Sequence, residues 1–366
     1  MSFAAEPAYR HGQPERTAVL LVNLGTPDAP TPAALRRYLA EFLWDPRVVE
    51  IPRPLWWLIL HGVILRTRPA QSAAKYASIW GADGSPLLRG TQRQVQALQA
   101  ELARRGHDDV QVRCAMRYGQ PAVGQVLDEL KAEGATRILV LPMYPQYAAA
   151  TTASVIDAVN AWSQRVRRLP ELRFVNRYHD HPGYIAALAA SVREHWAAHG
   201  RGQKLVMSFH GVPKRSLLLG DPYHCECHVT ARLLAQALGL GADDYVLTFQ
   251  SRLGRAEWLQ PYTEPTVKRL AAEGVRHIDA ICPGFACDNL ETLEEIAQEA
   301  RDAFLQAGGQ RFGFVPCLNE RADHVAALAD LAEQHLQGWP TRAGQRRSEA
   351  DRAAQAARAR TLGATA

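Results

Sequence analysis

An internal repeat with a spacing of 140 residues restricts the folds open to this chain. Two stretches carry the same residues in the same order. They are Gln120-Pro121, Leu130, Ala132-Glu133-Gly134 and Ile138 in the first, and Gln260-Pro261, Leu270, Ala272-Glu273-Gly274 and Ile278 in the second. Each copy predicts a helix, a glycine that ends it and an apolar strand that stops at a proline. We therefore expect one structural unit to occur twice.

Other predicted strands also occur in matching pairs. The strand Ala18–Val22 and the turn after it match the segment Val206–Pro213, and the short strand 113–115 matches Tyr245–Phe249. Strands and helices alternate throughout, which is typical of mainly parallel sheets with helices on both faces. With 366 residues, 47% of them hydrophobic, the chain is long enough for two such α/β domains, each with its own core.

Polar side chains follow the predicted strands at their carboxyl ends, where open α/β sheets bind ligands. They are Asn23, Arg117, Tyr144, His210 and Gln250. Two sheets that face each other would gather these side chains around one cleft. His210 is the member best suited to proton transfer near neutral pH, although a histidine at the end of a strand can equally be a structural, hydrogen-bonded residue.

A row of glutamates follows the predicted strand His277–Ile281. The next helix carries Glu291, Glu295 and Glu299 at a spacing of four residues, so their carboxylates should share one face, opposite the apolar face. No Lys or Arg of this helix lies in the row. The row therefore indicates either a bound cation or a plain solvated surface. Asp288, three residues before Glu291, also fits the start of a capping box.

Charge, termini and cysteines limit the class of protein. The net charge is +5, and the basic residues are scattered without an aromatic-interleaved stripe, so we do not expect nucleic acid as a partner. The N-terminus lacks the pattern of a secretory signal. The six cysteines show no disulfide-framework spacing, which is typical of a reducing compartment. We expect a cytoplasmic location, with contact at a membrane surface as an open alternative.

Residues 54–65, PLWWLILHGVIL, form the most apolar run in the chain. They are too few to span a bilayer, which takes about 17–25 residues. Arginines flank the run on both sides. Three interpretations remain open: a segment that lies in a membrane interface, the mouth of a site for a flat apolar ligand, and a helix packed within the first domain.

A series of motifs resembles the ferrochelatase family, in order, from about residue 18 to residue 335. The motifs are LVNLGTP, Y-x-x-I-x-x-x-x-GSPL, MRYGQP, LPMYPQYA, SFHGVPKRS, GDPY, the pair FQSRLG and WLQPYT, and CPGF-x-x-D-x-LETLEEI. The resemblance implies two Rossmann-like, chelatase-type domains with a porphyrin between them. It also implies a lyase that inserts Fe²⁺ into protoporphyrin IX to form protohaem, the last step of haem biosynthesis. A coproporphyrin enzyme and a non-catalytic tetrapyrrole or metal carrier remain as alternatives.

The resemblance assigns roles to individual residues. His210 and Glu291 correspond to the iron site and to proton removal, and which of the two takes the protons stays open. Glu295 and Glu299 correspond to an acidic relay that leads the metal in. The positions expected to line the porphyrin cleft are Tyr76, Ser85, Arg117, Tyr118, Trp258, Phe285 and Asp288.

The resemblance also suggests a division of the chain. We expect a leader at 1–16, a first domain at 17–165 with a porphyrin lip at 47–68, a second domain at 171–338 that carries the metal site, and a basic, disordered tail at 339–366. The linker should lie near Ser163–Glu171, where charge and proline interrupt the pattern.

The cysteines permit a metal centre without requiring one. Ligands for a [2Fe-2S] cluster, which some ferrochelatases carry, would have to come from Cys225, Cys227, Cys287 and Cys317. The tail after Trp339 has no cysteine, and a Cys-x-Cys pair alone is no known ligand pattern. We therefore favour ordinary thiols and expect no required cofactor, with Fe²⁺ as a substrate. The expected partners are protoporphyrin IX, ferrous iron and, through 54–65, the surface of the inner membrane.

Overall fold

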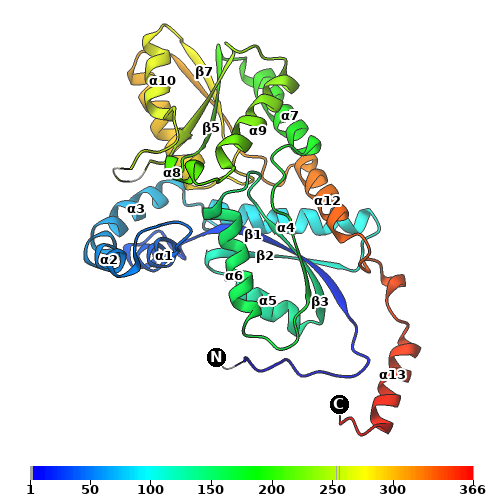
Figure 1. Cartoon of the computed structure of the whole chain (residues 1–366). Helices are drawn as coiled ribbons and strands as arrows, with labels where there is room; N and C mark the ends of the chain where they lie inside the picture. The colour runs from blue at the N-terminus through cyan, green and yellow to red at the C-terminus, as the bar shows by residue number, and fades with distance from the viewer. Residues whose placement is uncertain (1–2, 253, 255, 366) are drawn as a thin grey trace.

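Two four-stranded parallel sheets form the framework of the computed structural model, which describes residues 3–252, 254 and 256–365 (Figure 1). The first sheet has the order β2-β1-β3-β4 and the second the order β6-β5-β7-β8. The strands are β1 (Arg16–Thr26), β2 (Val110–Gly119), β3 (Ala135–Pro142), β4 (Glu171–Phe174), β5 (Lys204–His210), β6 (Tyr245–Gln250), β7 (His277–Ile281) and β8 (Arg311–Val315). The shared strand order confirms the predicted duplicated α/β fold.

Helices connect these strands and cover the sheets (Figure 1). In the first half they are α1 (Pro32–Trp44), α2 (Arg53–Ile59), the π-helix η1 (Leu60–Ile64), α3 (Leu65–Ile79), α4 (Pro86–Arg104), α5 (Val123–Ala132), the π-helix η2 (Ala149–Ala153) and α6 (Ser154–Ser163). In the second half they are α7 (Pro182–His199), α8 (Lys214–Leu218), α9 (Tyr223–Leu238), α10 (Thr263–Ala272), the π-helix η3 (Glu291–Ala300), α11 (Arg301–Gln306) and α12 (Ala322–Leu336), followed by η4 (Ala343–Gln345) and α13 (Glu349–Thr361).

The hydrophobic core is partly shared between the halves. Alternate residues of a strand point to opposite faces of its sheet. Val19 and Leu21 of β1 therefore enter a large cluster that also contains Leu205 and Met207 of β5. The residues between them, such as Leu20, enter a cluster confined to the first half, and a third cluster is confined to the second half. The expectation of two separate cores therefore holds only for the outer faces.

The boundary between the halves lies later than the sequence suggests. Glu171–Phe174 forms β4, which pairs in parallel with β3 in the first sheet. The crossing therefore consists of residues 175–181, and the predicted linker Ser163–Glu171 was placed too early. The charged and proline-containing stretch is the loop between α6 and β4 rather than a linker.

The helix after each sheet's last strand crosses to the other half. α7 follows β4 but packs against α9 and β8 of the second half, whereas α12 follows β8 and packs against α4 and β3 of the first. The two crossing helices also contact each other. Arg105, just after α4, binds the carboxylates of Asp330 and Glu333 on α12 at 2.6 and 2.8 Å. The two halves are thus interlocked.

The two ends of the chain lie along the first half. Glu6 of the predicted leader binds Lys131, and the amides of Arg167 and Arg168 donate to it. These interactions lower the pKa of Glu6 to about 2, the Lys131 contact being the largest cause. Residues 1, 2 and 366, at the ends of the predicted leader and tail, lie outside the described residues.

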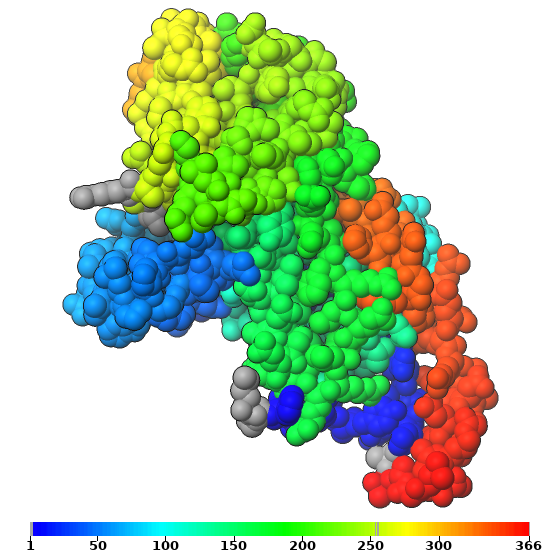
Figure 2. Space-filling view, in the orientation of Figure 1, coloured from blue at the N-terminus to red at the C-terminus, as the bar shows by residue number. Residues whose placement is uncertain are grey.

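The tail differs from the disordered segment predicted for it. The Thr17 hydroxyl donates to the carbonyl of Pro340, and Arg346 pairs with Asp109, so the tail is fixed to the edge of the first sheet. The Ser348 side chain caps the start of α13. This helix lies at the periphery of the molecule, at the lower right of Figure 2. The tail is rich in alanine, which favours a helix.

Residues 54–65 belong to α2, η1 and the first residue of α3, in a small group of helices that also includes α1. Trp56, Leu60 and Leu65 are buried there, so the packed-helix interpretation is confirmed for one face. The other face exposes large apolar side chains, namely Leu55, Trp57, Leu58 and Val63, which are 51–61% accessible. Among the described residues, no helix is long and apolar enough to cross a membrane.

Candidate functional site

A cavity of about 260 Å³ lies where the carboxyl ends of the two sheets meet. Asn23 and Tyr144 line it from the first half, and His210, Phe285 and Glu291 line it from the second. Most of the remaining wall is apolar. Within the described residues, His210 and Glu291 are the only Asp, Glu, His, Lys or Arg side chains among those that line the cavity.

His210 is the last residue of β5, and its ring is oriented by the next residue. Its Nδ1 lies 2.5 Å from the carbonyl oxygen of Gly211. Because a carbonyl oxygen only accepts hydrogen bonds, Nδ1 carries the proton in the neutral ring and Nε2 carries the free lone pair. A Cβ at Gly211 would lie 2.6 Å from the carbonyl oxygen of Gln250, so only glycine allows this close approach of β5 to β6.

Glu291 begins the π-helix η3, which lies between the cavity and the surface. The Asn289 side chain accepts a hydrogen bond from the amide of Thr292, and the Thr292 hydroxyl accepts one from the amide of Asn289. This reciprocal pair is a capping box one residue later than the predicted pair of Asp288 and Glu291. Gln250 at the end of β6 donates to the carbonyl of Glu291 and fixes this first turn.

The glutamate row runs from the cavity towards solvent. Glu295 accepts a hydrogen bond from Ser251, and its pKa is raised mainly by burial and then by the charge of Glu291. Glu299 is exposed and lies at the outer end. The row extends along η3, which is a π-helix with wider turns than an α-helix. The spacing of four residues did not reveal this, because it fits both types of helix.

A cation from the other half of the molecule lies on this row. Lys75 of α3 places its Nζ 2.9 Å from Oε1 of Glu294 and 2.9 Å from Oε1 of Glu299. Sequence reasoning missed this residue, since it considered cations on the same helix only. The sequence did identify the neighbouring residue Tyr76 as part of the porphyrin cleft, which placed this part of α3 near the site.

Comparisons with known proteins identify the family. Residues 16–336 match the family model described as Ferrochelatase. The chain is 64% identical to the ferrochelatase of Methylibium petroleiphilum over 366 residues, which is 100% of both chains. It is 64% identical to that of a Polaromonas species over 94% of both chains, and 60% identical to that of Dechloromonas aromatica over 93% of both. The chain belongs to the ferrochelatase family.

Solved structures support the ferrochelatase fold. SirB from Bacillus subtilis with Fe³⁺ is 12% identical and superposes with a TM-score of 0.51, covering 88% of this chain and 96% of SirB. The sirohydrochlorin chelatase SirB of subspecies spizizenii in complex with cobalt gives 0.50 at 11% identity, covering 88% and 97%. As a ferrochelatase, the chain is a metal-insertion lyase of tetrapyrrole biosynthesis, with a porphyrin and iron as substrates.

The cavity contains some, but not all, of the residues that the ferrochelatase resemblance assigns to the porphyrin. Tyr76, Ser85, Trp258 and Phe285 line it. Residues 54–65 are not among its lining residues, whereas Val48 and Val49 of the predicted lip 47–68 are.

Arg117 and Tyr118 do not line the cavity, contrary to the prediction. Arg117 binds Asp45 at 2.6 Å, and the Tyr118 hydroxyl donates to the same carboxylate at 2.8 Å. Ser154 completes the group, and these contacts lower the pKa of Asp45 against the opposing effect of its burial. β2 runs to Gly119, so these residues belong to the strand and do not follow its end.

Asp288 was also predicted to line the cavity and does not. Its carboxylate accepts hydrogen bonds from the amide of Cys317 and from the side chains of Thr292 and Asn319. Asp288 therefore joins the start of η3 to the loop after β8, which gives it a structural position in this ferrochelatase.

The four candidate cluster cysteines are spread over three parts of this ferrochelatase. Cys225 and Cys227 are on α9, the first exposed and the second buried in the shared core. Cys287 lines the cavity, and Cys317 follows β8. Burial raises the pKa of the Cys227 and Cys317 thiols. In the described part of the chain, no three His, Cys, Asp or Glu side chains are arranged to hold a metal ion.

Proposed function

We propose that this ferrochelatase inserts Fe²⁺ into protoporphyrin IX to form protohaem with the release of two protons, as the last step of haem biosynthesis. One observation carries the proposal. Among the described residues, the mostly apolar cavity between the two sheets is lined by one imidazole and one carboxylate, those of His210 and Glu291. An apolar wall suits a flat macrocycle, and the two polar groups suit the exchange of protons for a metal ion at its centre.

His210 and Glu291 are assigned to the metal and to the protons. Insertion requires two pyrrole N–H protons to leave while Fe²⁺ binds the ring nitrogens in their place. The free Nε2 of His210 is able to accept a proton or to ligate a borderline metal, and a carboxylate is able to do the same. Glu291 raises the pKa of Glu295 and His210 lowers it. Both side chains therefore lie close enough to Glu295 for their charges to act on it.

The wall of the cavity is assigned to the porphyrin ring. Metal entry requires the ring to buckle so that nitrogen lone pairs point out of its plane. Aromatic side chains of Tyr76, Trp258 and Phe285 line the cavity. A wall that binds the buckled ring better than the flat ring would accelerate insertion by differential binding.

Glu295 and Glu299 are assigned to the delivery of iron. A hydrated ion has to lose water before it reaches the ring, and carboxylates replace water ligands in steps. Glu299 is exposed and Glu295 lies between it and the cavity wall at Glu291. The row therefore offers oxygen ligands along a path from solvent to the site.

Anaerobic loss of porphyrin fluorescence on addition of Fe²⁺ tests the proposal. The wild type should consume protoporphyrin faster than coproporphyrin. His210→Ala should lose at least about 100-fold in rate, the lower range for removal of a positioned acid or base, while porphyrin binding survives. The exposed His199→Ala is the matched control. Faster use of coproporphyrin would favour the alternative substrate, and no consumption of either would favour a carrier.

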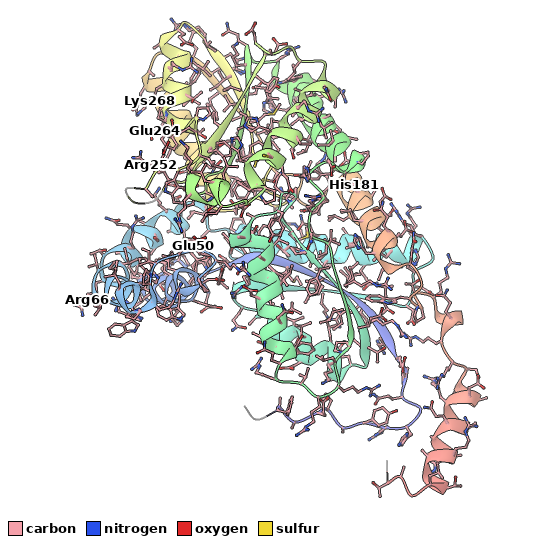
Figure 3. The ribbon with its side chains drawn as sticks, in the orientation of Figure 1. Glu50, Arg66, His181, Arg252, Glu264 and Lys268 are labelled. Atoms are coloured by element: carbon pink, nitrogen blue, oxygen red, sulfur yellow. The ribbon has the colours of Figure 1, made fainter. Side chains whose placement is uncertain are left out.

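We also propose that this ferrochelatase contacts the cytoplasmic surface of the inner membrane through α2 and η1. The exposed face of Leu55, Trp57, Leu58 and Val63 would enter the lipid headgroup region. Arg66 projects outward from the same group of helices (Figure 3), where it would meet anionic lipids. The double variant Trp57→Glu with Leu58→Glu should abolish cosedimentation with vesicles of phosphatidylglycerol and phosphatidylethanolamine. Unchanged cosedimentation would refute the contact.

No cofactor is proposed for the reaction. Fe²⁺ enters as a substrate, and the cysteines act as ordinary thiols. Iron analysis and a visible absorption spectrum of the purified protein test this point. An iron content near two per chain with thiolate absorption would instead indicate a [2Fe-2S] cluster.

A further inference from the structure

A single ammonium joins the two halves of the molecule at the outer end of the glutamate row. Lys75 belongs to α3 of the first half, whereas Glu294 and Glu299 belong to η3 of the second. α3 and η3 pack against each other, so the contact bridges the site. The adjacent residue Tyr76 lines the cavity. One short segment of α3 therefore contacts both the proposed porphyrin site and the proposed metal route.

The position of Lys75 is intermediate between solvent and interior. Its side chain is 42% exposed, that of Glu299 is 56% exposed and that of Glu294 only 9%. The ammonium therefore lies between an exposed carboxylate and a buried one.

The energetics differ from those of an ordinary surface ion pair. An isolated exposed pair contributes little to stability. Here one ammonium is shared by two carboxylates, and Glu291 and Glu295 carry no Lys or Arg partner among the described contacts. The group keeps a net negative charge and attracts a divalent cation, yet its outermost oxygens already hold a monovalent one. A divalent ion that uses Glu299 has to displace Lys75.

We propose that Lys75 is a positioning residue that closes the outer end of the metal route, and that an incoming hydrated divalent cation enters by displacing its ammonium from Glu294 and Glu299. The inference rests on the proposed role of the glutamate row in metal delivery. Because Lys75 is on α3, arrival of the cation also releases a contact between the helices on the two sides of the cavity.

Binding of Mn²⁺ to the full-length protein without porphyrin tests the inference. The free ion is counted from its electron paramagnetic resonance signal at low ionic strength. Lys75→Met should bind Mn²⁺ about tenfold more tightly than the wild type, because one competing charge is removed, and Lys75→Arg should retain the wild-type affinity. The double variant Lys75→Met with Glu299→Gln should lose the gain. Unchanged or weaker binding by Lys75→Met would overturn the proposal.

A matched control is available on another helix. Lys268 pairs with Glu264 one turn away on α10; both lie at the surface (Figure 3), and neither lines the cavity. Lys268→Met removes a similar ion pair and should leave the affinity for Mn²⁺ unchanged. In the porphyrin assay, Lys75→Met should lower KM for Fe²⁺ with little change in kcat. A wild type that fails to metallate porphyrin would refute the proposed function, whereas an active wild type with Mn²⁺ affinity equal to that of Lys75→Met would refute only the gate.

Discussion

At the scale of single residues, the site depends on side chains whose charge is adjusted by their neighbours. Glu295 is partly buried beside Ser251 and Gln250, and it lies near the charges of Glu291, His210 and Lys75. Burial is the largest effect and raises its pKa above 4.5, with Glu291 adding to the rise. Folding therefore strengthens proton binding at this carboxyl group.

A pH-dependent cost to stability follows from the raised pKa of Glu295. Because the folded state binds the proton more tightly than the unfolded state, the contribution of Glu295 to stability is full below pH 4.5 and is lost as the pH rises through the raised pKa. Glu295→Gln, which stays neutral, should gain stability relative to the wild type over that interval. Urea unfolding of both proteins at several pH values measures the difference. A gap that does not widen with pH would contradict the assignment.

At the scale of elements, η3 is held in place by its first turn. The capping box of Asn289 and Thr292 fixes the backbone just before Glu291, and the Gln250 side chain fixes the Glu291 carbonyl. The direction in which Glu291 faces therefore depends on Asn289, Thr292 and Gln250.

Loss of the cap should lower both stability and activity. Asn289→Ala removes the side-chain acceptor for the Thr292 amide and should cost about 1 kcal/mol in the free energy of unfolding. Since the first turn carries Glu291, kcat for porphyrin metallation should fall as well. Asn289→Asp keeps an acceptor oxygen and is expected to recover most of the stability. Denaturant titration and the fluorescence assay measure the two effects, and a stable but fully active Asn289→Ala protein would show that the cap is dispensable.

The elements were largely predictable, because their signals are local. The predicted strand His277–Ile281 coincides with β7, and the repeat located α5 and α10 in equivalent places. The glutamate row and His210 were also found, since each follows a recognisable strand. Arg117 was misplaced because the predicted strand stopped too early, and one residue more or less changes the face on which a strand side chain lies.

The contacts that were missed join distant parts of the chain. Lys75 and Glu294 are 219 residues apart, and neither has a neighbour in sequence that indicates the other. The π-helical turns of η3 also left no trace, since a spacing of four residues is compatible with both helix types. The exchange of α7 and α12 depends on tertiary packing, whereas the repeat shows only that two units exist.

At the scale of the whole molecule, the shared core should make the two halves unfold together. Leu141 of β3 and Leu205 of β5 are fully or almost fully buried in the same cluster. Leu141→Ala should destabilise the protein by about 2–5 kcal/mol and shift the unfolding midpoint of both halves equally. Hydrogen exchange read separately from β2 and β6 at increasing denaturant checks this, with the exposed Leu362→Ala as control. Separate midpoints would contradict a single cooperative unit.

The crossing of α7 and α12 has a consequence for how a porphyrin reaches the proposed catalytic residues, His210 and Glu291. Separation of the two sheets would break the contacts of α7 and α12 with the opposite halves and would expose the shared apolar cluster to water, so this route is costly. The small bundle of α1, α2, η1 and α3 is packed through two smaller clusters, one of which also contains Tyr118 of β2, and is cheaper to displace. We therefore expect the tetrapyrrole to enter by displacement of this helix bundle, while the two sheets keep their relative positions.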